Sequence, residues 1–271
     1  MSLRPHTHDR STETLNNPVL PARALILCAG DGRRWGDHLG IKKQLIYFNG
    51  ESLLDRTCRL LNNNRITDII CVTRDNSIRS PAMTIFTPER CGLLVETILS
   101  TVPKWQGRTI ILLGDVFFTE NSIRRISCFR GDLVIFGRPW ASRLVGCTHG
   151  ELFAMSFSHQ CSHKIIQSAQ QIVRLASDGA RGNMWDLYHY LAHLPLNSGR
   201  SESRYFCVID DITNDFDSPS DYERTRMIYS AMTSRSQFER IGMLLRIAMR
   251  LPIHLALRRA VSIGQPILPK S

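Results

Sequence analysis

Apolar runs of strand type alternate with helical patterns along most of this chain, and this alternation limits the folds that it can adopt. Six runs predict strands, at residues 24–29, 68–73, 109–114, 132–137, 152–157 and 206–212. Between them, residues 51–61, 92–102 and 183–194 show the apolar spacing of amphipathic helices. Several strand segments are apolar throughout, as is typical of strands covered on both faces. We therefore expect a three-layer α/β/α, Rossmann-like domain with a mostly parallel sheet.

The two ends of the chain differ from this central part. Residues 1–22 are polar and contain no hydrophobic signal core, so we expect a disordered leader and a cytoplasmic protein. No apolar run approaches the length that crosses a bilayer. The eight cysteines are scattered without a Cys-x-x-Cys pair, which indicates reduced thiols. We assign residues 23–232 to the α/β domain and residues 233–271 to an extension.

Positive charge is concentrated in that extension and in the few residues before it. The formal net charge is +10, but residues 224–271 alone contain nine Lys or Arg side chains and one acid, Glu239. The rest of the chain is close to neutral, which argues against nucleic-acid binding. Residues 233–271 predict a basic amphipathic helical segment, interrupted at Pro252. Two interpretations remain open for it: packing on the domain or on a second subunit, that is self-association, or peripheral membrane contact through its arginines.

The strongest local feature is the run ALILCAGDGRRWG at residues 24–36, a strand that leads into a glycine-containing loop. Gly30 and Gly32 allow the backbone to turn so that its N–H groups face an anion. The glycines alone resemble a loose dinucleotide fingerprint, which is a weak signal. The arginines beside the loop suit a nucleoside triphosphate better, because guanidinium groups bind phosphate oxygens in pairs.

A lysine pair, Lys42 and Lys43, follows this loop and precedes an Asn-Gly turn and a helix. A lysine at this distance from a phosphate-binding loop can neutralise a leaving phosphate group. Together these segments resemble the opening of nucleotidyltransferases related to sugar-phosphate nucleotidylyltransferases and phospho-alcohol cytidylyltransferases, with a MobA-like NTP transferase domain. The matching residues are Ala29, Gly30, Gly32, Arg34, Lys43, Leu45, Gly50, Leu53, Leu54 and Thr57. Lys42 departs from the pattern, because the family usually has proline there.

The resemblance implies a GT-A type fold and a metal site made by two distant aspartates. Asp115, in the run ILLGDVFF, is similar to the family's strand-end aspartate that holds Mg²⁺. Asp217, in NDFDSPSDYE, is similar to the second metal ligand in the family's closing motif, whereas Asp221 is expected to cap the next helix. Asp210 and Asp211 are alternatives to Asp217. Arg34, Lys43 and Asp115 are the expected catalytic residues, and Ala29, Gly30, Gly32, Arg34 and Lys43 are expected to bind the NTP.

The resemblance places the acceptor in the region between residues 138 and 205. Arg138, Arg143 and Glu151 are candidates to hold its phosphate and a hydroxyl group, and surface salt bridges are the competing interpretation. Residues 87–97 fall where the family recognises the nucleobase, largely through backbone groups. The expected partners are therefore an NTP and a phosphorylated small molecule.

We thus expect Mg²⁺-dependent transfer of a nucleotidyl group from CTP, UTP or GTP to a sugar or polyol phosphate, with release of pyrophosphate. Two other classes remain open. A GT-A glycosyltransferase shares the layered fold, but it normally carries Asp-x-Asp at the strand end, where this chain has Gly-Asp-Val. A non-catalytic nucleotide-binding protein is the other, and the complete set of charged motif residues argues against it.

Overall fold

The computed structural model describes residues 22–30, 32–36, 38–142, 145–196, 198, 201, 203–233 and 241–242. The expected leader, most of the basic extension and Arg143 lie outside these residues. The division of the chain near residue 232 therefore stays a prediction. The described strands and helices extend from Ala22 to Thr233.

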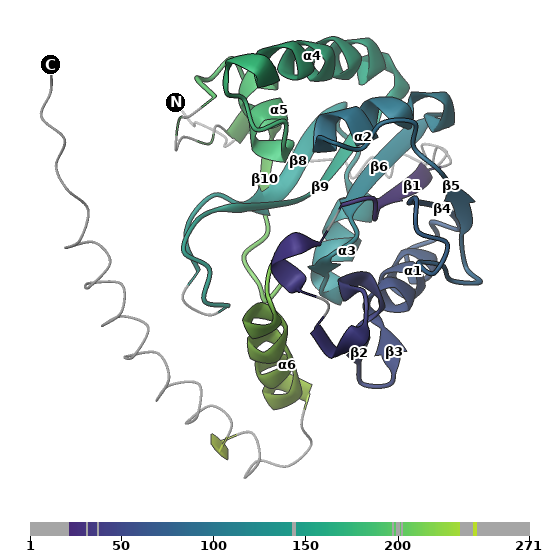
Figure 1. Ribbon diagram of the computed structural model, residues 1–271, viewed down its shortest axis with the longest axis vertical. Helices are drawn as coiled ribbons and strands as arrows, with labels where there is room; N and C mark the ends of the chain where they lie inside the picture. Colours follow the sequence, from purple (N-terminus) through teal and green to yellow (C-terminus); the bar gives the residue numbers. More distant parts are fainter. Residues whose placement is uncertain are drawn as a thin grey trace, which may run out of the picture.

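A seven-stranded, mostly parallel sheet forms the centre of the molecule (Figure 1). Its order is β10-β8-β9-β6-β1-β4-β5, and only β9 runs antiparallel to its neighbours, β6 and β8. The sequence analysis located six of the seven strands and missed the short edge strand β5. The strands are β1 (Ala22–Leu27), β4 (Asp68–Val72), β5 (Thr84–Phe86), β6 (Arg108–Leu113), β8 (Leu133–Arg138), β9 (Glu151–Ser158) and β10 (Phe206–Val208).

Helices cover both faces of this sheet, which confirms the expected three-layer architecture. Successive residues of β1 point to opposite faces: Ala24 and Ile26 join one apolar cluster, and Leu25 and Leu27 join the other. The first cluster contains α1 (Leu53–Asn63) and α3 (Glu120–Cys128). The second contains α2 (Leu94–Ser100), α4 (Ser162–Leu175) and α5 (Met184–Leu191). Burial on both faces explains why the strand segments are continuously apolar.

A third, aromatic cluster lies beside the sheet and joins elements that are far apart in the sequence. It contains the hairpin of β2 (Tyr47–Phe48) and β3 (Glu51–Ser52), whose turn residues Asn49 and Gly50 both have positive φ. Residues of β7 (Val116–Phe117) and α6 (Pro219–Thr233) also belong to it, together with Phe216, which directly follows β11 (Asn214–Asp215). The rings of Phe48 and Phe216 stack with centroids 5.6 Å apart, and Tyr222 meets both edge-on.

The segment after β10 departs from the sequence-based expectation. Residues 206–212 were expected to form one strand, but β10 ends at Val208. The backbone N–H of Ile209 still donates to the carbonyl of Gly137, and the chain then leaves the sheet for a loop that leads to β11. That loop carries the acidic residues of the site described below.

The remaining helical turns are short 3₁₀ segments, at Arg33–Trp35, His38–Gly40, Lys43–Leu45, Val102–Lys104, His159–Cys161, Ala176–Asp178 and Ser203–Tyr205. None of the eight cysteines, all of which lie in described positions, forms a disulfide. Within the described part of the chain, no helix combines the length and the apolar character needed to cross a membrane.

Gly114 allows the closest approach between β1 and the end of β6. A Cβ atom added there would collide with the Cys28 sulfur and lie 2.8 Å from the carbonyl oxygen of Leu27, which the Gly114 N–H contacts at 2.9 Å. We expect Gly114→Ala to destabilise the fold by about 1–3 kcal/mol, as overpacking typically does. Urea denaturation measures this. Gly30→Ala is the control, because its Cβ would meet no atom within 4 Å, and equal losses in both variants would contradict the prediction.

Candidate active site

The glycine loop follows β1 and faces open space. The N–H of Cys28 still pairs with the Val72 carbonyl at 2.8 Å, and the chain then turns away from the sheet. Gly32 has φ 62°, a left-handed conformation that other residues rarely adopt. Gly30 has no positive φ, so its lack of a side chain serves to leave the loop surface bare rather than to permit a turn. The indole of Trp35 is buried and donates to the carbonyl of Ile41 at 2.8 Å, which holds the far side of the loop.

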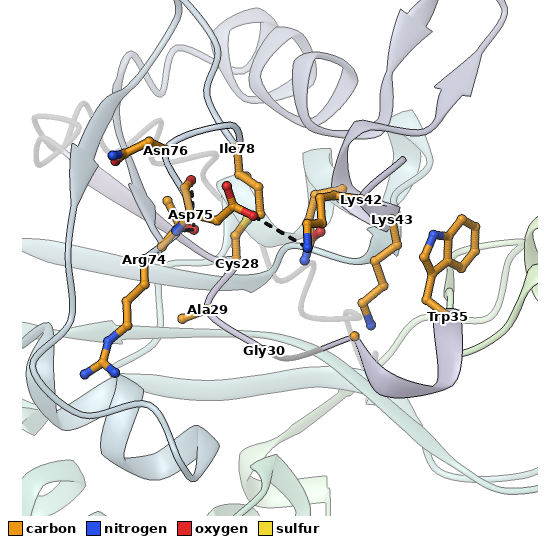
Figure 2. A pocket seen from close by; sticks show the side chains of 13 residues that line it. Cys28, Ala29, Gly30, Trp35, Lys42, Lys43, Arg74, Asp75, Asn76 and Ile78 are labelled. Atoms are coloured by element: carbon orange, nitrogen blue, oxygen red, sulfur yellow. Dashed lines mark hydrogen bonds and ion pairs between the residues drawn. The ribbon is translucent and has the colours of Figure 1, made fainter. Parts of the chain in front are cut away.

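A pocket of about 440 Å³ opens beside this loop (Figure 2). Three segments line it: the loop after β1, the turn around Lys42–Gln44 and the loop after β4. Lys42 and Asp75 form an ion pair of 3.7 Å across it. The lining residues are Cys28, Ala29, Gly30, Gly32, Trp35, Lys42, Lys43, Gln44, Thr73, Arg74, Asp75, Asn76 and Ile78.

Two cations from the predicted motif contact the two predicted aspartates. The ammonium of Lys43 forms an ion pair with the carboxylate of Asp115, and the Lys43 side chain is only 11% exposed. Arg34 contacts the carboxylate of Asp217 at 2.6 Å, although 73% of the Arg34 side chain is exposed. An exposed pair of this kind adds little stability, so Arg34 is free to exchange its partner at small cost. The structure thus brings together Arg34, Lys43, Asp115 and Asp217.

Pairing between β7 and β11 brings the two aspartates close. Asp115 stands between the end of β6 and the start of β7, and Val116 and Phe117 pair antiparallel with Asp215 and Asn214. The N–H of Phe216 then donates to the Asp115 carbonyl at 3.0 Å. Side chains alternate between faces along an extended segment, so the ring of Phe216 packs in the aromatic cluster while its two neighbours face the carboxylate of Asp115.

Asp215 is a third carboxylate at this place, and the sequence analysis missed it. Burial, together with the nearby charges of Glu151, Asp217 and Asp115, raises the pKa of Asp215 well above its ordinary value. Burial also raises the pKa of Asp217, although Arg34 and Lys43 oppose this effect. Burial lowers the pKa of Lys43, but attraction to Asp115, Asp217 and Asp215 outweighs it, and the net shift is upward. The three carboxylates of Asp115, Asp215 and Asp217 therefore lie beside only two cationic side chains, Lys43 and Arg34.

The other acidic candidates have separate tasks. The Asp211 carboxylate accepts hydrogen bonds from the Thr119 hydroxyl at 2.6 Å and from the Thr213 N–H at 2.8 Å, so it fixes the loop. Asp221 was expected to cap the helix, but it lies within the first turn of α6, and its carboxylate accepts from the N–H of Ser218 at 2.8 Å just before the helix. Asp210 is exposed.

Arg138 and Glu151, the candidates for acceptor binding, lie opposite each other at the end of β8 and the start of β9. They form an ion pair of 2.6 Å, with side chains 1% and 6% exposed. The competing interpretation as surface salt bridges is wrong, because both groups are buried. Acceptor binding by these two residues stays a prediction.

The loop expected to face the nucleobase is held through its backbone. The guanidinium of Arg74 donates to the carbonyls of Pro88, at 3.1 Å, and Glu89. The Glu96 carboxylate accepts from the N–H of Leu93 at 3.0 Å at the start of α2. Base recognition by residues 87–97 stays a prediction.

The carboxylates suit a hard cation. Among the described residues, no three Asp, Glu, His or Cys side chains are grouped to hold a metal ion by themselves. Mg²⁺ is commonly held by one or two carboxylates together with substrate phosphates, so a pair such as Asp115 and Asp217 is enough. The upward pKa shifts of Asp215 and Asp217 fit a site that lacks positive charge. These residues therefore fit Mg²⁺.

Comparison with known proteins agrees with this geometry. Residues 24–147 match the MobA-like NTP transferase domain. The chain therefore contains a nucleotidyltransferase domain, which confirms the resemblance seen in the sequence motifs and the expected class of enzyme. No curated protein matches the chain.

Two solved structures share the fold. One is a protein from Bacillus anthracis described as a glucose-1-phosphate thymidylyltransferase, with 13% identity and a TM-score of 0.56, over 80% of this chain and 98% of the other. The second is the CTP:phosphocholine cytidylyltransferase of Streptococcus pneumoniae, with 13% identity and a TM-score of 0.50, over 77% and 99%. At this identity the likeness establishes the fold alone.

The crowding of carboxylates gives a test on metal-free protein. A raised pKa means that the folded state holds its proton more tightly than the unfolded chain, so stability is lost as the pH rises through the folded pKa. We expect Asp215→Asn to raise the melting temperature in EDTA at pH 8, with little gain at pH 4. A gain of 1 kcal/mol corresponds to about 2–4 °C for a domain of this size. An unchanged pH profile of the melting temperature would contradict the prediction.

Proposed function

We propose that this protein is a Mg²⁺-dependent nucleotidyltransferase that transfers a nucleotidyl group from CTP, UTP or GTP to a phosphorylated small molecule, such as a sugar or polyol phosphate. The observation that carries the proposal is the pairing of Arg34 with Asp217 and of Lys43 with Asp115, where Lys43 also lines the pocket beside the glycine loop. Two cations and two acids suit a reaction in which phosphate charge must be held and then released as pyrophosphate.

In the proposed reaction an oxygen of the acceptor phosphate attacks the α-phosphorus of the NTP. The bond from that phosphorus to the bridging oxygen breaks, and pyrophosphate leaves with the electron pair. The acceptor oxygen is already anionic at neutral pH, so no general base is needed. Catalysis then depends on positioning and on charge neutralisation.

The residues of the chain divide this work. Backbone N–H groups of the loop around Ala29, Gly30 and Gly32 would bind phosphate oxygens. Asp115 and Asp217 would hold Mg²⁺, which when bound neutralises charge on the phosphates. Lys43 and Arg34 would then turn from these carboxylates to the β- and γ-phosphates. The exposure of Arg34 supports such an exchange.

A screen for pyrophosphate release distinguishes the proposal from its alternatives. Four NTPs are tested against a panel of sugar and polyol phosphates, and release is expected only when an NTP and an acceptor are both present. Hydrolysis of nucleotide sugars without pyrophosphate chemistry would favour a glycosyltransferase. NTP binding without any turnover would favour a non-catalytic protein.

Asp115 is the residue on which the metal assignment depends most. We expect Asp115→Asn to lower kcat by about two orders of magnitude or more, the scale on which one lost electrostatic contact acts. Wild-type activity should disappear in EDTA and return with Mg²⁺. Steady-state kinetics measure the first effect, and circular dichroism checks that the variant is folded. Near-normal turnover in a folded Asp115→Asn protein would refute the assignment.

Arg34 and its neighbour Arg33 provide a matched pair. The family pattern gives the phosphate role to Arg34 and leaves Arg33 variable. We expect Arg34→Ala to raise the KM for the NTP by roughly tenfold to a hundredfold, because a hydrogen bond to a charged group contributes about 1.5–3 kcal/mol. Arg33→Ala should have little effect. Equal losses in the two variants would show that the loop is aligned with the wrong arginine.

A further inference from the structure

Arg138 is a buried charge that the proposed chemistry does not use. Its side chain is 1% exposed, although it lies at the end of β8 where the sheet meets the acidic loop. A buried charge is tolerated only when hydrogen bonds inside the protein replace its contacts with water. The partners of Arg138 therefore indicate what its guanidinium does.

These partners come from two separate segments. One terminal nitrogen, Nη1, donates to the carbonyl oxygens of Asp211, at 3.4 Å, and Thr213, at 3.2 Å. The other, Nη2, donates to the Glu151 carboxylate at 2.6 Å and to the side-chain oxygen of Asn214 at 3.2 Å. A single planar group thus joins the ends of β8 and β9 to residues 211–214.

Residues 211–214 lead directly to the acids of the site. Between Val208 and Asn214 the chain forms no helix or strand, so its course depends on individual bonds. Beyond Asn214 come Asp215 and Asp217, and the Phe216 N–H binds the carbonyl of Asp115 at 3.0 Å. A shift of residues 211–214 would therefore move Asp217 relative to Asp115.

The Glu151 carboxylate is also held in place. Its second oxygen accepts a hydrogen bond from the thiol of Cys147, which in turn lies 3.0 Å from the side-chain oxygen of Asn214. Both carboxylate oxygens of Glu151 therefore accept hydrogen bonds from inside the protein, and the side chains of Arg138 and Glu151 are both buried.

We propose that Arg138 is a positioning residue, whose guanidinium, oriented by Glu151, fixes residues 211–217 so that Asp217 lies beside Asp115. This inference rests on the proposed function, because it assigns to Asp217 a task in that reaction. It also replaces acceptor binding by Arg138 and Glu151, since the Arg138 side chain is 1% exposed, both of its terminal nitrogens donate to internal acceptors, and its Nε is buried without a partner.

Arg138→Met removes the donors and keeps most of the volume. Its control is Arg108→Met. Arg108 lies at the start of β6, at the opposite end of the sheet, is also buried, at 7% exposure, and donates to the carbonyls of Gly131 and Arg130. In hydrogen exchange, we expect peptides covering residues 209–218 to exchange at least about tenfold faster in Arg138→Met and unchanged in Arg108→Met.

Two further measurements separate positioning from substrate binding. Mn²⁺ binding, followed by electron paramagnetic resonance, should weaken about tenfold or more in Arg138→Met, as expected when hydrogen bonds of a charged group are lost. In kinetics, kcat should fall while the KM for the acceptor stays within about threefold of wild type. Arg138→Lys keeps the charge but not the two-sided donor geometry, so we expect intermediate values.

Several outcomes would overturn the inference. A large rise in acceptor KM, with unchanged exchange and Mn²⁺ binding, would assign Arg138 to the acceptor. Equal exchange in the Arg138 and Arg108 variants would indicate general loosening. If Arg138→Met does not fold, wild-type behaviour of Arg138→Lys would also refute positioning. If the wild-type protein transfers no nucleotide, the proposed function fails, and the exchange and Mn²⁺ results still decide the role of Arg138.

Discussion

The pairing of β7 with β11 is the contact on which the candidate site depends. Each strand has only two residues, and about a hundred residues separate them, so their own hydrogen bonds are a weak source of stability. The aromatic cluster below them supplies what the ladder lacks. The rings of Phe117 and Phe216 meet Phe48 there, with centroids 4.7 and 5.6 Å away. Apolar packing of Phe216, directly after β11, thus fixes the neighbouring carboxylates of Asp215 and Asp217, which repel one another.

That repulsion is a cost of the site in the absence of a bound cation. Three carboxylates, Asp115, Asp215 and Asp217, face two cationic side chains, Lys43 and Arg34. Lys43 is enclosed and binds Asp115 tightly, whereas Arg34 is exposed and contributes little stability. This arrangement makes little physical sense for stability alone, since neutral side chains of similar shape would relieve the crowding. An arrangement with unbalanced acids near the pocket of about 440 Å³ is instead suited to a divalent cation and an anionic substrate together.

The sequence predicted the elements that depend on local pattern and missed those that depend on distant contacts. Apolar periodicity located most strands of the sheet, and the glycine loop, Arg34, Lys43, Asp115 and Asp217 were placed through motifs. The antiparallel direction of β9 has no local signal, because a fully buried strand is apolar in either direction. Asp215 lies in the same motif as Asp217 but received no role, because its burial beside Asp115 follows from the pairing of β11 with β7. Arg138 and Glu151 were taken for surface or substrate-binding groups, because charged residues are rarely buried and only the structure shows that they pair.

The two buried arginines of the sheet show that its ends have different tasks. Arg108, at the start of β6, donates to backbone carbonyls of Arg130 and Gly131, which closes the loop before β8. Arg138, at the end of β8, donates to the backbone that leads to the acidic residues. The terminal nitrogens of both guanidinium groups donate to internal acceptors, which makes both charges compatible with a stable core. Only the second lies at the carboxyl ends of the parallel strands, where open α/β sheets bind their ligands. A buried arginine that donates to backbone carbonyls therefore closes a loop at one end of the sheet. At the other end, a second one orders the residues that would meet the substrate.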